Sequence, residues 1–354
     1  MTGLFPLNIS LEEYELLSSC QKSPLVQHQN ILIPVIYSII VALGVIGNGL
    51  VVFVLCKSSS RKTVANTYIL NLALSDLLFL LSLPFWAVYY SFDYDWIFGR
   101  LMCKLCGGLL TFNLYASIFF ITCMSMDRYM AIVHPLKSQR CRNLCRARIV
   151  SFLVWFIAGL TTVPTIMFRD THEFGNVTAC VMHFHSPGWF VGLGLMKNTL
   201  GFLLPFVIIT SCYCIIGKHL LMAPGLDKST SNLDRVLKMV GAVVLAFFFC
   251  WFPFHTLTFL DVLVSLRFLE ACNLEQTISL GIPFTICLGF SNSAINPFLY
   301  CFVGNHFREQ LGGLTQACAS NLSQKRGSFS TRLSSFSRKL SDLKDLAPIE
   351  NGTV

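Results

Sequence analysis

Charged side chains are scarce in this sequence. Of its 354 residues, 12% are charged and 54% are hydrophobic, whereas an ordinary soluble domain carries about 25% charged residues. No Pro/Gly/Ser-rich linker divides residues 1–300 into separate domains, and no internal repeat is visible. These shortages argue against a soluble multidomain protein, and against a transporter built from repeated halves.

Signatures of catalysis are missing as well. The apolar stretches contain no His/Cys/Asp group with the spacing of metal ligands or of a nucleophile and its base, and no glycine-rich phosphate loop occurs. Residues 1–30 lack the basic start and apolar core of a signal peptide. We therefore expect the apolar stretch that begins at Ile31 to act as its own signal for membrane insertion. The sequence therefore indicates a membrane protein that is not an enzyme.

Long apolar runs are what the sequence has in abundance. A helix that rises about 1.5 Å per residue needs about 20 apolar residues to cross a bilayer. Seven stretches reach that length: Ile31–Cys56, Thr67–Phe92, Leu105–Met126, Ile149–Phe168, Trp189–Gly217, Met239–Leu260 and Gln276–Gly304. Since lipid offers the backbone no hydrogen bonds, each must be helical.

The predicted fold is therefore an all-α seven-transmembrane helix bundle over residues 31–304. An extracellular tail at 1–30 precedes it, and a short amphipathic cytoplasmic helix at 305–317 follows. Residues 318–354, rich in serine interleaved with lysine and arginine, predict a disordered tail open to kinases.

The basic residues orient the bundle. Most of the 26 Lys and Arg fall in the loops after spans one, three, five and seven and in the tail. The other side holds only Lys22, Arg100, Lys104, Arg169, Lys197 and Arg267. Because positive charge accumulates on the cytoplasmic side, we expect a multi-pass plasma-membrane protein with its N-terminus outside.

This topology places few of the 15 cysteines in an oxidising compartment. The four outer ones are Cys20, Cys103, Cys180 and Cys272, and four cysteines allow three pairings. Cys103 starts the third span and Cys180 lies in the second outer loop. We favour a Cys103–Cys180 bridge, with Cys20–Cys272 tying the N-terminus to the third outer loop, over four unpaired thiols.

Several positions are candidates for modification. Asn8 and Asn176 lie in outer Asn-X-Ser/Thr sequons and are expected to carry glycans. Tyr14 is flanked by acidic residues, a setting compatible with sulfation or with a merely solvated acidic stretch. Cys318 follows the amphipathic segment and is a candidate for palmitoylation, or a plain cytosolic thiol.

One carboxylate, Asp76, lies in the middle of a span, where a bare charge costs several kcal/mol. Polar residues of other spans at similar depth supply its candidate partners: Asn48, Asn113, Ser117, Asn292, Ser293 and Asn296. We expect an allosteric Na⁺ site formed by Asp76, Asn113, Ser117 and Asn292. The alternative is a protonated Asp76 that only joins helices by hydrogen bonds.

Prolines recur inside the spans, where each removes a backbone hydrogen bond and is expected to kink its helix. They are Pro84, Pro164, Pro205, Pro253 and Pro297. Pro253 stands among bulky aromatic residues in CWFPF (250–254), which predicts a hinge.

These features form an ordered pattern: Asn48, LALSD (72–76), DRY (127–129), Trp155, Pro205 with Tyr213, CWFPF and NPFLY (296–300). Together they resemble a rhodopsin-family G-protein-coupled receptor over roughly Ile31–Leu311. The resemblance implies an activation switch formed by Asp127, Arg128, Tyr129, Tyr213, Asn296, Pro297 and Tyr300. It also implies G proteins or other transducers as cytoplasmic partners.

Longer runs narrow the resemblance. ASIFFITCMSMDRY (116–129) and LMKNTLGFLLPF (195–206) resemble angiotensin II receptors, most closely the type 2 subtype. The ligand implied is a short peptide whose C-terminal carboxylate enters the bundle. Lys197 and Arg169 would bind that carboxylate, and Asp261 would meet a basic residue of the peptide.

The walls of the implied site are aromatic and polar: Tyr37, Trp86, Tyr89, Tyr90, Thr111, Trp251 and His255. One position departs from the family pattern, because Ser279 stands where an Asp is usual. Receptors for kinin, apelin or chemokine peptides are the near alternatives.

Overall fold

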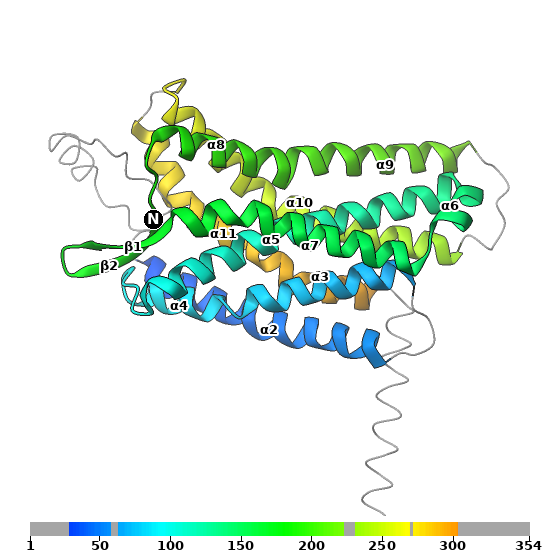
Figure 1. The fold of residues 1–354 in the computed structure, drawn as a ribbon, viewed down its shortest axis with the longest axis horizontal. Helices are drawn as coiled ribbons and strands as arrows, with labels where there is room; N and C mark the ends of the chain where they lie inside the picture. The colour runs from blue at the N-terminus through cyan, green and yellow to red at the C-terminus, as the bar shows by residue number, and fades with distance from the viewer. Residues whose placement is uncertain (1–27, 58–62, 223–230, 270–271, 304–354) are drawn as a thin grey trace, which may run out of the picture. The chain divides into compact units, whose positions relative to one another are not determined.

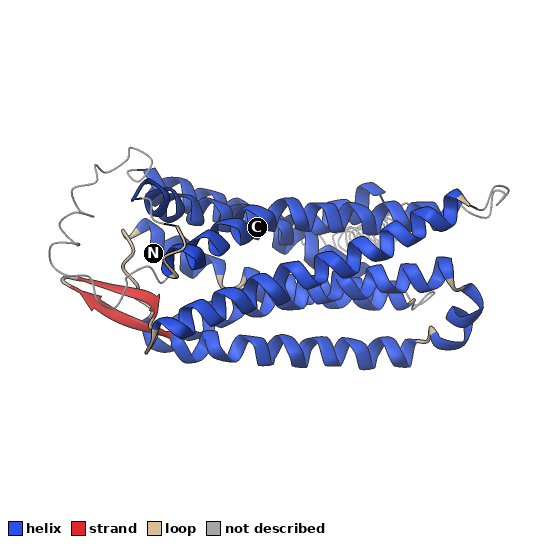
Figure 2. Cartoon of the chain, turned by 90° about the horizontal axis from the view of Figure 1, so that it is seen from above, coloured by secondary structure: helices blue, strands red, loops and turns tan. Residues whose placement is uncertain are grey.

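The computed structural model describes residues 28–57, 63–222, 231–269 and 272–303. Seven helical segments among them are long and apolar enough to cross a membrane. In chain order they are α2 (Gln29–Lys57), α3 and α4 (Val64–Leu80, Leu83–Ser91), α5 (Gly99–Val133), α7 (Leu144–Phe168), α8, η2 and α9 (Pro187–Asn198, Thr199–Leu203, Leu204–Leu221), α10 (Ser231–Ser265) and α11 (Cys272–Val303). They run lengthwise side by side in both views (Figures 1 and 2). The predicted all-α seven-transmembrane fold is confirmed.

Some predicted features lie outside the described residues. They are the tail up to residue 27 with Asn8, Tyr14 and Cys20, the amphipathic helix at 305–317, and the segment 318–354 with Cys318.

The surface of the bundle suits lipid rather than water. Phe152 is 69% exposed and Phe249 is 74% exposed, while Asp76 and Asn296 are fully buried. A continuous apolar exterior of this kind is unfavourable in water but costs nothing in hydrocarbon, where polar groups must be satisfied inside. The burial pattern supports the membrane assignment independently of hydropathy.

Two of the five predicted proline kinks interrupt their spans. The second span breaks between α3 and α4 just before Pro84, where Ser82 Oγ donates a hydrogen bond of 2.7 Å to Phe79 O. The fifth span widens into the π-helix η2 just before Pro205. Pro164, Pro253 and Pro297 lie inside continuous helices, because a single missing hydrogen bond need not end a helix that its neighbours support.

A β-hairpin covers one end of the bundle (Figure 2). Its strands, β1 (Arg169–Phe174) and β2 (Val177–Met182), pair antiparallel with Thr171 opposite Cys180. The sequence analysis did not predict these strands. The hairpin is held against the loop before α5, since Trp96 N donates to Thr178 O (2.6 Å) and Thr178 N donates to Asp95 Oδ1 (2.9 Å).

A short helix, α6 (Pro135–Cys141), connects α5 and α7 at the opposite end of the bundle (Figure 1). Asn143 then caps α7, because its Oδ1 accepts a hydrogen bond of 2.8 Å from Arg146 N. The two ends of the bundle are thus different: a hairpin closes one, and a helical loop crosses the other.

Candidate functional site

A cavity of about 200 Å³ lies inside the bundle beneath the hairpin. Its lining brings together the predicted ligand residues except His255. They are Tyr37, Trp86, Tyr89, Tyr90, Thr111, Arg169, Lys197, Trp251 and Asp261. Residues far apart in the sequence therefore converge on one space, from α2, α4, α5, α8, α10 and the start of β1.

Arg169 enters the cavity from the first position of β1. Its guanidinium carbon lies 5.3 Å from the ring centroid of Trp86, a cation–π contact. The side chain crosses α5 over Gly107, where any Cβ would collide with Arg169 Cδ. Burial lowers the pKa of Arg169 to about 10, and the nearby phenols of Tyr89 and Tyr90 oppose that shift. Arg169 is therefore charged at neutral pH.

Lys197 enters from the last turn of α8, with Nζ 5.5 Å from the ring centroid of Phe254. Asp261 of α10 is buried and lines the same cavity. Among the described residues, however, no carboxylate lies within 4.0 Å of Lys197 or Arg169. Two cations that form no ion pair with a described residue therefore face one cavity, with Asp261 as the carboxylate of the same lining, and such an arrangement is suited to receiving an anion.

The aromatic wall has unused hydrogen-bonding capacity. Trp86 Nε1 is buried and has no hydrogen-bond partner among the described residues. The rings of Trp86 and Tyr89 meet edge to face with centroids 5.8 Å apart, and Tyr37 and Tyr90 meet in the same way at 5.9 Å. Such rings offer an apolar face together with a polar tip, which suits the end of a peptide.

His255 lies behind this wall rather than in it. Its Nδ1 is 3.1 Å from Asn198 Oδ1, and its ring stacks on Phe202. Ser279 is exposed and does not line the cavity. The lining also contains apolar residues that the sequence analysis missed, among them Leu114, Tyr115, Phe184, Ile286 and Phe290. No sequence signal distinguishes them, because the sequence does not show whether an apolar residue of a span faces lipid or a pocket.

The Cys103–Cys180 disulfide predicted from topology is present, with the two Cα atoms 5.7 Å apart. It ties β2 to the first turns of α5, and Cys180 itself lines the cavity. The bridge therefore fixes the hairpin over the mouth. The predicted partner pair Cys20–Cys272 is not described, because Cys20 and the side chain of Cys272 lie outside the described part.

Asn176 stands at the exposed tip of the hairpin, next to Gly175, whose φ of 61° forms the turn. This place is open enough for a glycan, and glycosylation there stays a prediction.

Asp76 is fully buried in the middle of α3. Its oxygens accept hydrogen bonds from four buried side chains of α5 and α11: Ser293 (2.7 Å), Asn113 (3.0 Å), Asn296 (3.1 Å) and Ser117 (3.5 Å). Asn292 makes no hydrogen bond to Asp76, and Asn48 donates to the backbone oxygens of Gly44 and Ser293. Of the four predicted sodium-site residues, the structure thus brings three into contact.

At the α6 end of the bundle, Asp127 is shared by two arginines. Its Oδ2 lies 2.6 Å from Arg128 Nη2, and both of its oxygens accept hydrogen bonds from Arg142, at 2.7 and 2.9 Å. Tyr129 Oη lies 3.1 Å from His134 Nε2. Asp127 and Arg128 were both predicted as switch residues, whereas Arg142 was not, because its contact with Asp127 depends on how the loop folds.

The remaining switch residues lie at close contacts between helices. Tyr213 of α9 packs beside Gly241 of α10, and Pro297 of α11 packs against Gly47 of α2. The side chain of Tyr300 lies outside the described part.

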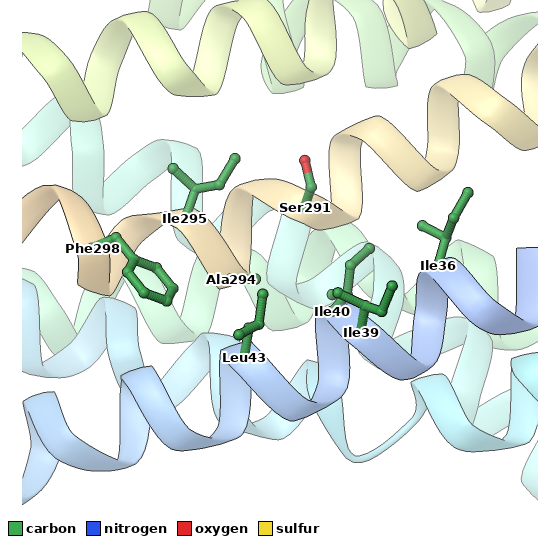
Figure 3. A pocket seen from close by; sticks show the side chains of 8 residues that line it. All are labelled: Ile36, Ile39, Ile40, Leu43, Ser291, Ala294, Ile295 and Phe298. Atoms are coloured by element: carbon green, nitrogen blue, oxygen red, sulfur yellow. The ribbon is translucent and has the colours of Figure 1, made fainter.

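A larger hollow of about 400 Å³ lies between α2 and α11 (Figure 3). Its lining carries no charged side chain, and its one hydroxyl, Ser291 Oγ, donates to Leu288 O (2.6 Å). Ile39 and Phe298 of this lining are largely exposed on the apolar surface. The lining of this hollow offers no free polar group that could orient a polar ligand. The cavity beneath the hairpin is therefore the candidate site, although it is the smaller of the two.

Known proteins match nearly the whole chain. The family model described as "7 transmembrane receptor (rhodopsin family)" matches residues 47–300. The type-2 angiotensin II receptor of Homo sapiens is 47% identical over 91% of this chain and 90% of its own length, and that of Rattus norvegicus gives the same values. The type-1 angiotensin II receptor of Ovis aries is 41% identical over 98% of this chain and 96% of its own length.

Proposed function

The chain belongs to the rhodopsin family of seven-transmembrane receptors, and from that premise we propose that its ligand is angiotensin II or a peptide closely similar to it. It is a peptide-hormone receptor and not an enzyme. The relatives of both angiotensin subtypes cover nine-tenths or more of this chain, and the type-2 relatives are the more similar.

One observation carries the proposal: Lys197 and Arg169, neither of which forms an ion pair with a described residue, face the same aromatic cavity. A buried charge without a partner is costly, and a peptide carboxylate would relieve that cost for both side chains at once. Asp261, in the same lining, is placed to meet a basic residue of the peptide. The cavity is smaller than the roughly 300–1,000 Å³ of sites for drug-sized ligands. It therefore suits the C-terminal end of the peptide, while the rest lies across the mouth.

We further propose that the hairpin end faces the outside of the cell. The loops and adjoining helix ends at the α6 end together carry most of the described Lys and Arg, as the positive-inside rule requires of a cytoplasmic face. In this orientation the ligand enters beneath the hairpin and the transducer, a G protein or another partner, meets the Asp127 end. The two ends would then communicate through the seven helices between them.

Competition binding tests the ligand. Membranes carrying this chain should bind a labelled angiotensin II peptide, and unlabelled angiotensin II should displace it at much lower concentration than kinin, apelin or chemokine peptides do. If one of those peptides displaced the label more effectively than angiotensin II, the chain would be a receptor of that other class.

We also propose that Asp76 holds Na⁺ when no agonist is bound. Two buried amide oxygens next to the cluster, Asn292 Oδ1 and Asn296 Oδ1, have no hydrogen-bond partner. Carboxylate, hydroxyl and amide oxygens are suitable ligands for a hard cation. Both oxygens of Asp76 accept hydrogen bonds, which favours the ionised carboxylate over a protonated acid, and an ionised carboxylate beside amide oxygens suits the cation.

Replacing Asp76 with asparagine tests this site. Na⁺ should lower agonist affinity in the wild type, because it stabilises a conformation that agonist binds less well, and Asp76→Asn should abolish that dependence. The measurement is agonist displacement of a labelled ligand in NaCl and in choline chloride of equal ionic strength. Equal Na⁺ sensitivity of the two proteins would place the site elsewhere.

A further inference from the structure

Three histidines cluster on the hairpin above the cavity, and neither the switch nor the peptide site uses them. His172 belongs to β1, and His183 and His185 follow β2. The ladder continues one residue past β2, because His183 N donates to Phe168 O (2.7 Å), and the chain bends at His185. Successive side chains of an extended segment point to opposite faces.

This alternation separates the histidines from the pocket. Phe184 is buried and lines the cavity, whereas His183 and His185 on either side of it are exposed. The two imidazoles therefore share the face that points away from the cavity, with ring centroids 6.0 Å apart.

The third imidazole comes from the neighbouring strand. The ring centroids of His172 and His183 lie 4.6 Å apart, and the rings are inclined by 34°. His172 Nε2 is buried, and no described residue forms a hydrogen bond with it. His183 and His185, two residues apart beyond the end of β2, can together with His172 of β1 present three nitrogens to a single ion.

We propose that His172, His183 and His185 form a binding site for a divalent transition-metal ion of the Zn²⁺ class. Neutral imidazole is the commonest protein ligand of such ions, with Zn–N distances of about 2.0–2.1 Å, and three imidazoles leave a fourth position for water. As they stand in the described part of the chain, no three or more His, Cys, Asp or Glu side chains, these three histidines included, are arranged to hold a metal ion. Binding therefore rotates the two exposed rings, His183 and His185, toward His172.

Such an ion would stiffen the mouth of the cavity. Met182 and Phe184 both line the cavity, and they flank His183 directly. Cys180, two residues before Met182, is bridged to α5. A metal that links this segment to β1 therefore restrains the part of the hairpin between the disulfide and α8, and we expect it to slow exchange of the peptide. This last consequence rests on the proposed function, whereas the metal site does not.

The direct test is titration of ZnCl₂ into the purified full-length protein, followed by calorimetry in the absence of peptide. The wild type should show saturable binding that EDTA reverses and that Mg²⁺ does not reproduce, because Mg²⁺ prefers oxygen ligands. Alanine at position 172, 183 or 185 should each weaken that binding by at least about tenfold, the loss seen even when supporting residues of metal sites are changed. His219→Ala, which removes an exposed histidine at the other end of the bundle, should have no effect.

Folding is checked by the melting temperature without metal, which the three variants should share with the wild type. Where an alanine variant melts earlier, the asparagine variant at the same position replaces it. Bound Zn²⁺ should also raise the melting temperature of the wild type by mass action, and not that of His172→Ala. A wild type without saturable Zn²⁺ binding, or a folded His172 variant that binds Zn²⁺ as tightly as the wild type, would show the proposal to be wrong.

Discussion

Replacing Lys197 with alanine is expected to weaken binding of an angiotensin-like peptide with a free C-terminus by roughly 30- to 5,000-fold. Removing one partner of a buried charged pair typically costs about 2–5 kcal/mol, which corresponds to that range. Lys197 lines the cavity and has no described carboxylate within ion-pair distance, so its amine is available to a ligand. The measurement is equilibrium binding on membranes with matched surface expression.

The control is a change in the peptide rather than in the receptor. The same peptide amidated at its C-terminus lacks the carboxylate, so Lys197→Ala should weaken its binding far less. Lys218→Ala, in the exposed last turn of α9, should affect neither peptide. Equal losses for the free and amidated peptides would mean that Lys197 supports the pocket without contacting the carboxylate.

Removing the Cys103–Cys180 bridge, by alanine at both positions, should cost about 2–5 kcal/mol of stability, as for other native disulfides. Peptide binding should fall as well, because the bridge holds β2 over the cavity. Thermal unfolding can be followed with a thiol-reactive fluorophore, which reports the exposure of buried cysteines such as Cys212 and Cys250.

The matched control for this experiment is Cys214→Ala, which removes an unpaired cysteine from the outer surface of α9. It should leave both unfolding and binding unchanged. A double variant that unfolds at the wild-type temperature and binds peptide normally would show that the interactions of Trp96 and Asp95 with the hairpin suffice to hold it.

The spans and the disulfide were predictable because each depends on a local or a topological property. Length and hydropathy define a span by itself, and once the spans are known only Cys20, Cys103, Cys180 and Cys272 are left on the outer side. The direction in which a side chain points within a span was not predictable in this way. Asn292 and Ser293 are neighbours on α11, yet only Ser293 reaches Asp76, because one step along a helix turns the side chain by about 100°.

The geometry of the loops could not be predicted from the sequence either. The bidentate contact of Arg142 with Asp127 and the pairing of β1 with β2 both depend on where a chain reverses after leaving the membrane. Composition does not determine that path. The charged and aromatic pocket residues that were predicted came from the family resemblance, and for Lys197 the rarity of charge in a span added to it. Tyr115 and Phe290 were missed because nothing else in the sequence distinguishes an aromatic residue that faces a pocket.

Gly107 has a consequence for how this receptor can be altered. The guanidinium of Arg169 occupies the space that a side chain on α5 would fill, so the position of the cation depends on a hydrogen atom at residue 107. The anion binding proposed for Arg169 should therefore be lost on adding a single methyl group at residue 107, without a change in any charged or aromatic residue. Residues 107 and 169 must therefore be changed together when the ligand preference of this protein is redesigned. A larger residue at position 107 requires a shorter one at position 169.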